Sequence, residues 1–118
     1  TSVARGNTTL AAGSTTTTTI AHGLGVIPSY IQIVVTGVQP NAGSNYIICF
    51  GQATGISAES SVYFRSVATG RDTGNIVSLF DGAVTTTGDL TTLDATNIAI
   101  TWTGGDHGIL NIEWFAMK

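Results

Sequence analysis

Alternation of apolar and polar residues is the feature that most restricts what this chain can form. It runs through three long stretches, SYIQIVVTGV (29–38), NIAITWT (97–103) and GILNIEWFA (108–116), and through the shorter runs NYIICFG, SVYFRSV and NIVSLF. Because side chains on a strand point alternately to the two faces of a sheet, a period of two predicts half-buried strands. No window keeps the apolar spacing of three and four residues that an amphipathic helix needs, so we expect little or no helix.

Turn residues separate these runs. Asp81-Gly82 is a two-residue hairpin signal, and the segments 39–45 and 69–75 are Gly- and Asn-rich loops. The segment TGGDHG (103–108) joins the last two runs. Short strands about ten residues apart with such turns indicate a sandwich or a barrel. We therefore predict an all-β protein, an antiparallel β-sandwich of about seven to nine strands.

The chain has 118 residues, which is enough for one domain with a core that needs no disulfide or metal. We expect residues 1–7 to form an extended N-terminal arm and residues 8–118 to form the sandwich. Five consecutive threonines, 15–19, precede Ile20. A flexible low-complexity linker is one interpretation, but β-branched residues favour extended backbone, so we expect a surface or edge strand.

Charged residues make up only 9% of the chain, against about 25% in an ordinary soluble domain, while 20 residues are threonine. With a net charge of −3, copies repel one another weakly, so we expect assembly with itself or with a partner. The chain has only four basic residues, and no two are neighbours in sequence: Arg5, Arg65, Arg71 and Lys118. The cluster of positive charge that nucleic-acid binding needs is therefore missing. No stretch reaches the roughly 18 apolar residues of a membrane span, and we expect no membrane partner.

The segment IAHGLGVIPSYIQI (20–33) contains a G-x-G and a histidine. Pro28 occupies the third glycine position of a dinucleotide loop, and a period of two follows where a helix would be needed, so we exclude phosphate binding. Gly23 and Gly25 are expected to supply positive φ angles in a tight turn, with Pro28 opening the next strand. His22 could be a general base or a ligand. Since no other His, Cys or acid lies close by in sequence, we interpret it as a strand-end residue whose ring satisfies loop backbone groups.

The remaining reactive side chains form no recognisable catalytic or metal pattern. Cys49 lies inside an apolar run and is expected to be a small core residue. Two histidines and one cysteine far apart in sequence match no zinc spacing, and no G-x-S-x-G elbow is present. We therefore expect no enzyme, no cofactor and no metal. Among the aromatic residues, core packing is favoured over sugar stacking for at least two of Trp102, Trp114 and Phe115.

The order of motifs resembles that of small β-sandwich domains on tailed-phage virions. The chain runs from TTTTTIAHGLGVIPSYIQIV through a Gly/Asn loop to ITWTGGDHGILNIEWFAMK. In these domains an H-x-L/G-G-x-x-P turn feeds a core strand and an x-W-x-A strand ends the domain. Such domains are capsid decoration (cement) proteins or tail-fibre tips. The layout is also similar to that of the H-type lectins, sandwiches that form trimers and bind N-acetylgalactosamine; the matching elements are Pro28, Thr101-Trp102 and Trp114-Phe115-Ala116.

The resemblance implies a structural virion protein. The first hypothesis is a homotrimeric decoration subunit on the capsid exterior, whose arm 1–7 reaches onto the major capsid protein or other virion subunits. The alternative is a receptor-binding, lectin-like tip of a tail fibre that contacts a host surface glycan. Lectin sites of this type use acidic and arginine side chains at loop ends, which implies Arg65, Asp106 and His107 as the ligand contacts here.

Overall fold

The computed structural model describes residues 2–39, 46–65, 68–81 and 84–118, and within them it contains ten strands and no helix. Consequently, the described part has no helix long and apolar enough to cross a membrane. The strands are β1 Val3–Leu10, β2 Thr18–Ala21, β3 Tyr30–Val38, β4 Tyr46–Ala53, β5 Glu59–Arg65, β6 Ala68–Asp72, β7 Val77–Asp81, β8 Val84–Leu93, β9 Asn97–Thr103 and β10 Leu110–Met117.

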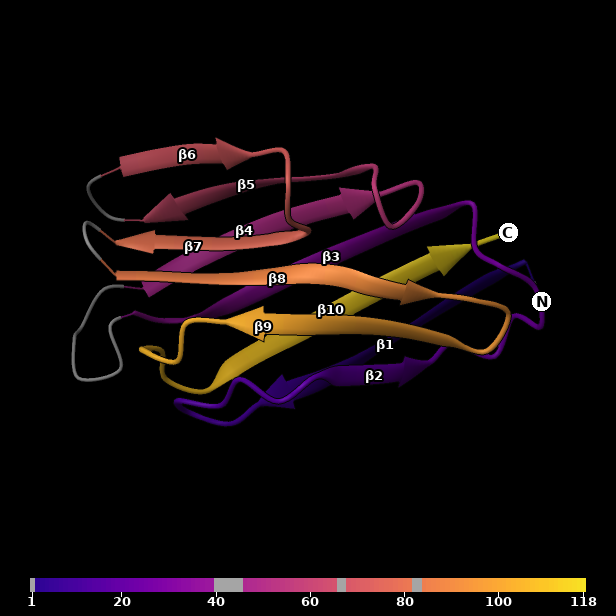
Figure 1. Ribbon diagram of the computed structural model, residues 1–118, viewed down its shortest axis with the longest axis horizontal. Coiled ribbons are helices and arrows are strands. Elements are labelled where there is room, and N and C mark those ends of the chain that lie inside the picture. Colours follow the sequence, from indigo (N-terminus) through magenta and orange to yellow (C-terminus); the bar gives the residue numbers. More distant parts are fainter. Residues whose placement is uncertain (1, 40–45, 66–67, 82–83) are drawn as a thin grey trace.

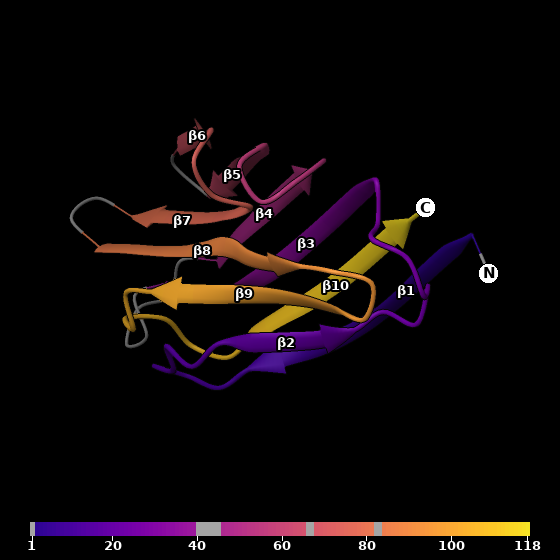
Figure 2. The ribbon, with the colours of Figure 1, turned by 45° about the vertical axis from the view of Figure 1, so that its right-hand side comes forward.

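The strands form two sheets that pack face to face (Figure 1). The larger sheet has the order β1-β10-β3-β4-β5-β6, and the smaller has the order β2-β9-β8-β7. All neighbouring strands are antiparallel. Figure 2 shows β8 and β9 crossing β3 and β10 at an angle, as twisted sheets do. The predicted antiparallel β-sandwich is confirmed, with ten strands in place of seven to nine.

The core consists of the inward-facing members of the alternating runs. On the larger sheet, Ile31, Ile33 and Val35 are fully buried, and on the smaller sheet Ile98 and Ile100 are as well. Burial of one such side chain stabilises the fold by about 1.5–3 kcal/mol. The period of two therefore identifies the residues that hold the sheets together, and it leaves the alternate residues on the two outer faces.

The N-terminal residues differ from the expected arm. Strand β1 pairs with β10 from Val3↔Met117 to Leu10↔Leu110, so the chain crosses the expected boundary after Asn7 without a break. The ring of Trp114 lies against Gly6, where an added Cβ would come within 2.8 Å of a ring carbon. Residues 3–7 therefore belong to the larger sheet. Their polar composition did not signal a strand, because β1 has only one buried residue, Leu10.

The segment 69–75 also differs, since its first four residues belong to β6 and not to a loop. This edge strand pairs with β5 through its backbone, which requires no apolar alternation. Gly70 faces the phenol ring of Tyr63, and any side chain there would collide with that ring. The glycine that suggested a loop is thus needed for close packing within a strand.

The threonine run is only partly a strand, since β2 begins at Thr18 and Ser14 to Thr17 lie outside it. Strand β3 begins at Tyr30, two residues after the buried Pro28. The turn predicted at Asp81-Gly82 lies between β7 and β8, but Gly82 is outside the described residues. Of the loop predicted at 39–45, the described part is Gln39.

Deletion of residues 1–7 is expected to destabilise the whole fold. It removes five of the eight β1–β10 residue pairs and uncovers Trp114. At about 1 kcal/mol for each lost hydrogen bond, plus the lost burial, the melting temperature should fall by about 10 °C or more. Circular dichroism during heating measures this change. Deletion of residues 1–2 alone is the control and should change it little, whereas an unchanged melting temperature after the longer deletion would show that β1 is a dispensable arm.

Candidate functional site

His22 closes the corner between β2 and β3. Its Nε2 lies 2.9 Å from the backbone oxygen of Asp94, and its Nδ1 accepts a hydrogen bond from the backbone N–H of Leu24 at 3.2 Å. Gly23 and Gly25 have φ angles of 73° and 74°, the positive values expected for this turn. The buried ring therefore has both nitrogens engaged by loop backbone, and the segment acts as a structural corner.

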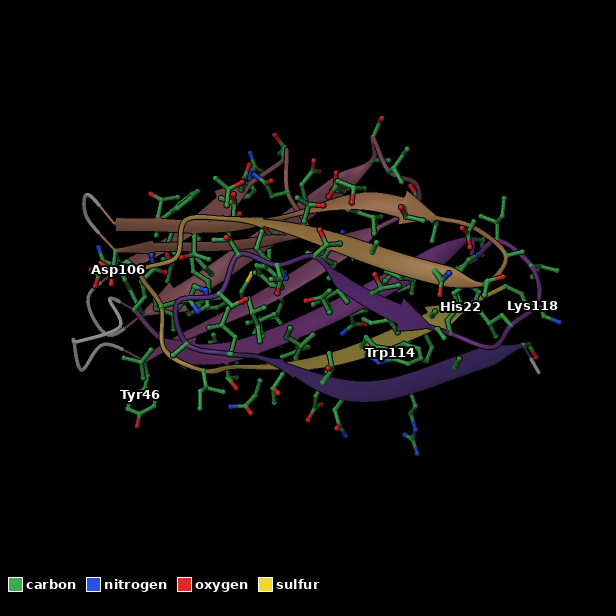
Figure 3. The ribbon with its side chains drawn as sticks, turned by 60° about the horizontal axis from the view of Figure 1, so that its bottom comes forward. His22, Tyr46, Asp106, Trp114 and Lys118 are labelled. Carbon is green, nitrogen blue, oxygen red and sulfur yellow. The ribbon has the colours of Figure 1, made fainter. Side chains whose placement is uncertain are left out.

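The three residues expected to contact a ligand do not form a common open site. His107 is fully buried, with Nε2 2.8 Å from the oxygen of Ser14 and Nδ1 2.7 Å from the oxygen of Gly108. Arg65 donates to Asp81 at 2.9 Å in a largely buried ion pair between β5 and β7. Asp106 is exposed, at the end of the sandwich opposite to His22 (Figure 3). His107 and Arg65 thus hold loops and strands in place, and Asp106 alone faces solvent.

Cys49 is buried in the core, and its burial raises the pKa of the thiol to about 11, so the reactive thiolate is disfavoured. Near it, Ser61 donates to Ser78 at 2.9 Å, and Ser78 donates to Asp72 at 2.7 Å. This partly buried chain joins β5, β6 and β7 and has no histidine that could act as a base. Within the described residues, no three His, Cys, Asp or Glu side chains form a group that could hold a metal.

The outer face of the larger sheet offers a different kind of site. Large apolar residues of β4 and β5 stay exposed there, among them Phe50 (43%), Val62 (38%) and Phe64 (42%). Phe50 and Phe64 contact each other edge to face, with ring centroids 6.0 Å apart. Val34 pairs across the strands with Phe50, and Phe50 with Val62, so the apolar side chains form a continuous row. Apolar side chains that a monomer leaves in solvent in this way indicate an interaction surface.

Shallow depressions form a continuous series across this face. The central one has a volume of about 280 Å³, and Tyr30, Gln32, Phe50, Gln52 and Ser60 are among its lining residues. A second depression, about 310 Å³, shares Tyr30, Gln52 and Ser60 with it. On the other side a third, about 250 Å³, shares Gln32 and reaches strands β10 and β1. We call this series the outer groove, and it crosses five strands from β5 to β1.

Side chains from three strands connect along the floor of the outer groove. The hydroxyl of Tyr30 (β3) donates to Oε1 of Gln52 (β4) at 3.3 Å, and Nε2 of Gln52 lies 3.5 Å from the hydroxyl of Ser60 (β5). Both bonds are long, and therefore weak. The groups are held in place by rigid strands, yet they can exchange these contacts for stronger ones to a ligand.

Glu59 lies at one end of the outer groove and is buried between the sheets. Its Oε1 accepts a hydrogen bond from the backbone N–H of Leu90 at 2.6 Å. Burial raises the pKa of Glu59 to about 7, and the neighbouring carboxyl of Asp89 adds to the rise, while the Leu90 bond opposes it. Near neutral pH, Glu59 is therefore protonated in a large share of molecules.

Sequence reasoning considered Trp114 and Phe115 for sugar stacking, and both line the β10 end of the outer groove, but it did not single out Tyr30, Phe50 or Gln52. A signal was present in NYIICFG, where Tyr46, Ile48 and Phe50 alternate with Ile47 and Cys49, so both faces of the strand are apolar. A strand that covers one core needs only one apolar face. The second face indicates a surface that binds something.

Comparison with known proteins gives little beyond this geometry. No family model matches the chain, and no curated protein matches it. Among solved structures, the chain is similar to part of the tailspike protein of Acinetobacter phage vB_ApiP_P1, with 16% sequence identity and a TM-score of 0.42. The match covers 96% of this chain and 21% of that chain, so the chain spans about a fifth of the tailspike's length. Similarity at this level identifies neither a family nor a function.

Replacement of Glu59 by glutamine should remove a pH dependence of stability. The pKa of Glu59 is raised from 4.5 to about 7, so its stabilising effect is complete below pH 4.5 and is lost as the pH rises through 7. Glu59→Gln keeps the acceptor for Leu90 without the charge. We expect a melting temperature a few degrees above the wild type at pH 8 and close to it at pH 4.5. The exposed Glu113→Gln is the matched control, and equal pH profiles for wild type and Glu59→Gln would contradict the prediction.

Proposed function

We propose that this chain is a non-enzymatic receptor-binding domain of a tailed-phage virion appendage, and that the outer groove is its contact with the host surface. The observation that carries the proposal is the outer groove itself, which combines exposed aromatic rings with uncharged hydrogen-bonding groups on rigid strands. Binding sites commonly combine an apolar lining with a few fixed polar groups.

Two further observations support this assignment. The order of motifs, from the His22–Pro28 corner to the closing Trp114-Phe115-Ala116, resembles that of virion-surface sandwiches. The histidines and the cysteine are buried, with their polar atoms in structural contacts. This arrangement suits a domain that binds without carrying out chemistry.

A capsid decoration subunit is the second candidate. It is favoured by the row Val34–Phe50–Val62, in which Phe50 and Val62 are exposed and which a neighbouring capsid subunit could cover. The arm mechanism does not fit, because residues 3–7 are already paired with β10. A decoration subunit of this structure would dock through the face of the larger sheet.

Trimer formation is part of the proposal, and the outer face of the smaller sheet suits it. Threonines of β8, of β9 and of the segment before β2 are linked through their hydroxyls: the hydroxyl of Thr101 lies 2.8 Å from that of Thr91 and 3.5 Å from that of Thr17. Threonine arrays are polar without charge, so they can be buried against a copy without leaving unpaired ions. Assembly through this face would leave the outer groove open on each subunit.

Gold-labelled antibodies against this chain, applied to virus particles that carry it, distinguish the two candidate functions. We expect gold on the appendages, and we expect an excess of the free domain to slow particle adsorption to host cells. Gold over the capsid with unchanged adsorption would favour decoration. Labelling of neither structure would contradict both candidates.

Light scattering tests the assembly face. We expect the mass of a trimer for the wild type and of a monomer for Thr101→Arg, because the new charge would be buried against a copy. Thr36→Arg is the matched control, since Thr36 is an exposed threonine on the outer face of the larger sheet. A trimer that survives Thr101→Arg but is dissociated by Thr36→Arg would move the interface to the larger sheet.

A further inference from the structure

We propose that the outer groove binds an extended, uncharged polysaccharide chain, with sugar rings against Phe50 and sugar hydroxyls on Gln32, Gln52 and Ser60. This inference rests on the proposed receptor-binding function and gives it a chemical class of ligand. It also places the ligand on the face of a sheet, away from the loop ends where Arg65, Asp106 and His107 lie.

The aromatic part of the lining suits the apolar face of a sugar ring. Phe50 is 43% exposed and is held by its edge-to-face contact with Phe64. The carbon-bound hydrogens on one face of a pyranose can pack on such a ring and exclude water from it. Because the ring is already fixed by Phe64, little side-chain entropy is lost when it is covered.

The polar part of the lining suits hydroxyl groups, which both donate and accept hydrogen bonds. Gln32 and Gln52 each offer a carbonyl oxygen and an NH₂ group, and Tyr30 and Ser60 each offer a hydroxyl. The existing contacts of Gln52, at 3.3 and 3.5 Å, are long enough for sugar hydroxyls to replace them with shorter bonds. The lining can therefore both donate hydrogen bonds to sugar hydroxyls and accept hydrogen bonds from them.

The charge of the lining favours an uncharged polymer over an acidic one. None of the residues that line the central depression is an aspartate, glutamate, lysine, arginine or histidine. Towards β1 the lining contains one charge of each sign, Arg5 and Glu113. With a net charge of −3 on the chain, an anionic polymer would gain no attraction.

The length and direction of the outer groove favour a chain of sugars over a single sugar or a peptide. The series of depressions crosses five strands, a span of about 19 Å at about 4.8 Å between neighbouring strands. An extended peptide would need partners for its own N–H and C=O groups. The backbone N–H and C=O groups of β3, β4 and β5 are already paired within the sheet, so they cannot serve as these partners. A bound peptide would therefore lose hydrogen bonds that a sugar retains.

Isothermal titration calorimetry with defined oligosaccharides tests the inference. The probes are hexamers of glucose, mannose, galactose and N-acetylglucosamine, the corresponding monosaccharides, and acidic hexamers of galacturonic acid and sialic acid. We expect at least one neutral hexamer to bind, and we expect its monosaccharide to bind at least about tenfold more weakly. The acidic hexamers should not bind.

Variants locate the binding on this face. Phe50→Ala and Gln52→Ala should each weaken binding of that hexamer about tenfold, since each removes one of the two kinds of contact. Thr36→Ala, on the same face but outside the lining, is the control and should bind like the wild type. Light scattering checks that the variants keep the mass of the wild type.

Several outcomes would overturn the inference. Binding of acidic hexamers alone, or of no hexamer at all, would contradict the class of ligand. Binding of a neutral hexamer that survives both variants would contradict its place. A change of oligomeric mass in Phe50→Ala would make the groove an interface between copies.

Periodate treatment of host cells separates this inference from the proposed function. If the free domain still blocks particle adsorption to oxidised cells, the receptor-binding function stands and the glycan inference fails. If antibodies find the chain on the capsid while a neutral hexamer binds, the proposed function fails and the glycan site stands.

Discussion

Burial of the two inner sheet faces against each other is the interaction on which the rest of this structure depends. The long alternating strands, such as β3 and β10, supply every second residue to that contact, so the core is built mainly from isoleucines, valines and leucines. The alternation that fills the core also fixes what points outward, because a shift of one residue would expose the whole apolar set. The packing beneath them therefore holds both the outer groove and the linked threonines of the smaller sheet in rigid, fixed positions.

The two outer faces of the sandwich differ in their chemistry. The smaller sheet presents threonines joined through their hydroxyls, whereas the larger presents aromatic and aliphatic side chains among amides. The difference is not required by folding, since either face would be stable with polar residues alone. Strand β4 is the clearest case, because Phe50 is exposed while Cys49 beside it is fully buried. An apolar residue that the core does not need is the best sign that the larger sheet binds something.

The fold class, the core face of each long run and the His22 corner could all be predicted from the sequence, because each depends on local pattern. The predictions that failed depend on contacts between separate segments of the chain. Strand β1 is ordered by pairing with β10, and Gly70 is required by the ring of Tyr63 seven residues earlier. His107 has the sequence context of an exposed loop residue, yet its ring reaches Ser14 at the other end of the chain. The outer groove as a continuous site was missed for the same reason, since its residues come from five strands whose pairing register cannot be seen in the sequence.

The position of the two histidines decides where binding can occur on this molecule. Loops at the ends of a sandwich are the usual place for binding residues. Here His22 is buried at one end and His107 in the loop at the other, and both rings are occupied by backbone groups. Substituting either would disturb the loop that it holds, so neither can be adapted to a ligand without loss of stability. The outer groove has no such constraint, because Gln32, Gln52 and Phe50 hold no loop and no core contact depends on their polar or aromatic ends. Recognition on this chain can therefore change at the face of the larger sheet while the ends keep the fold intact.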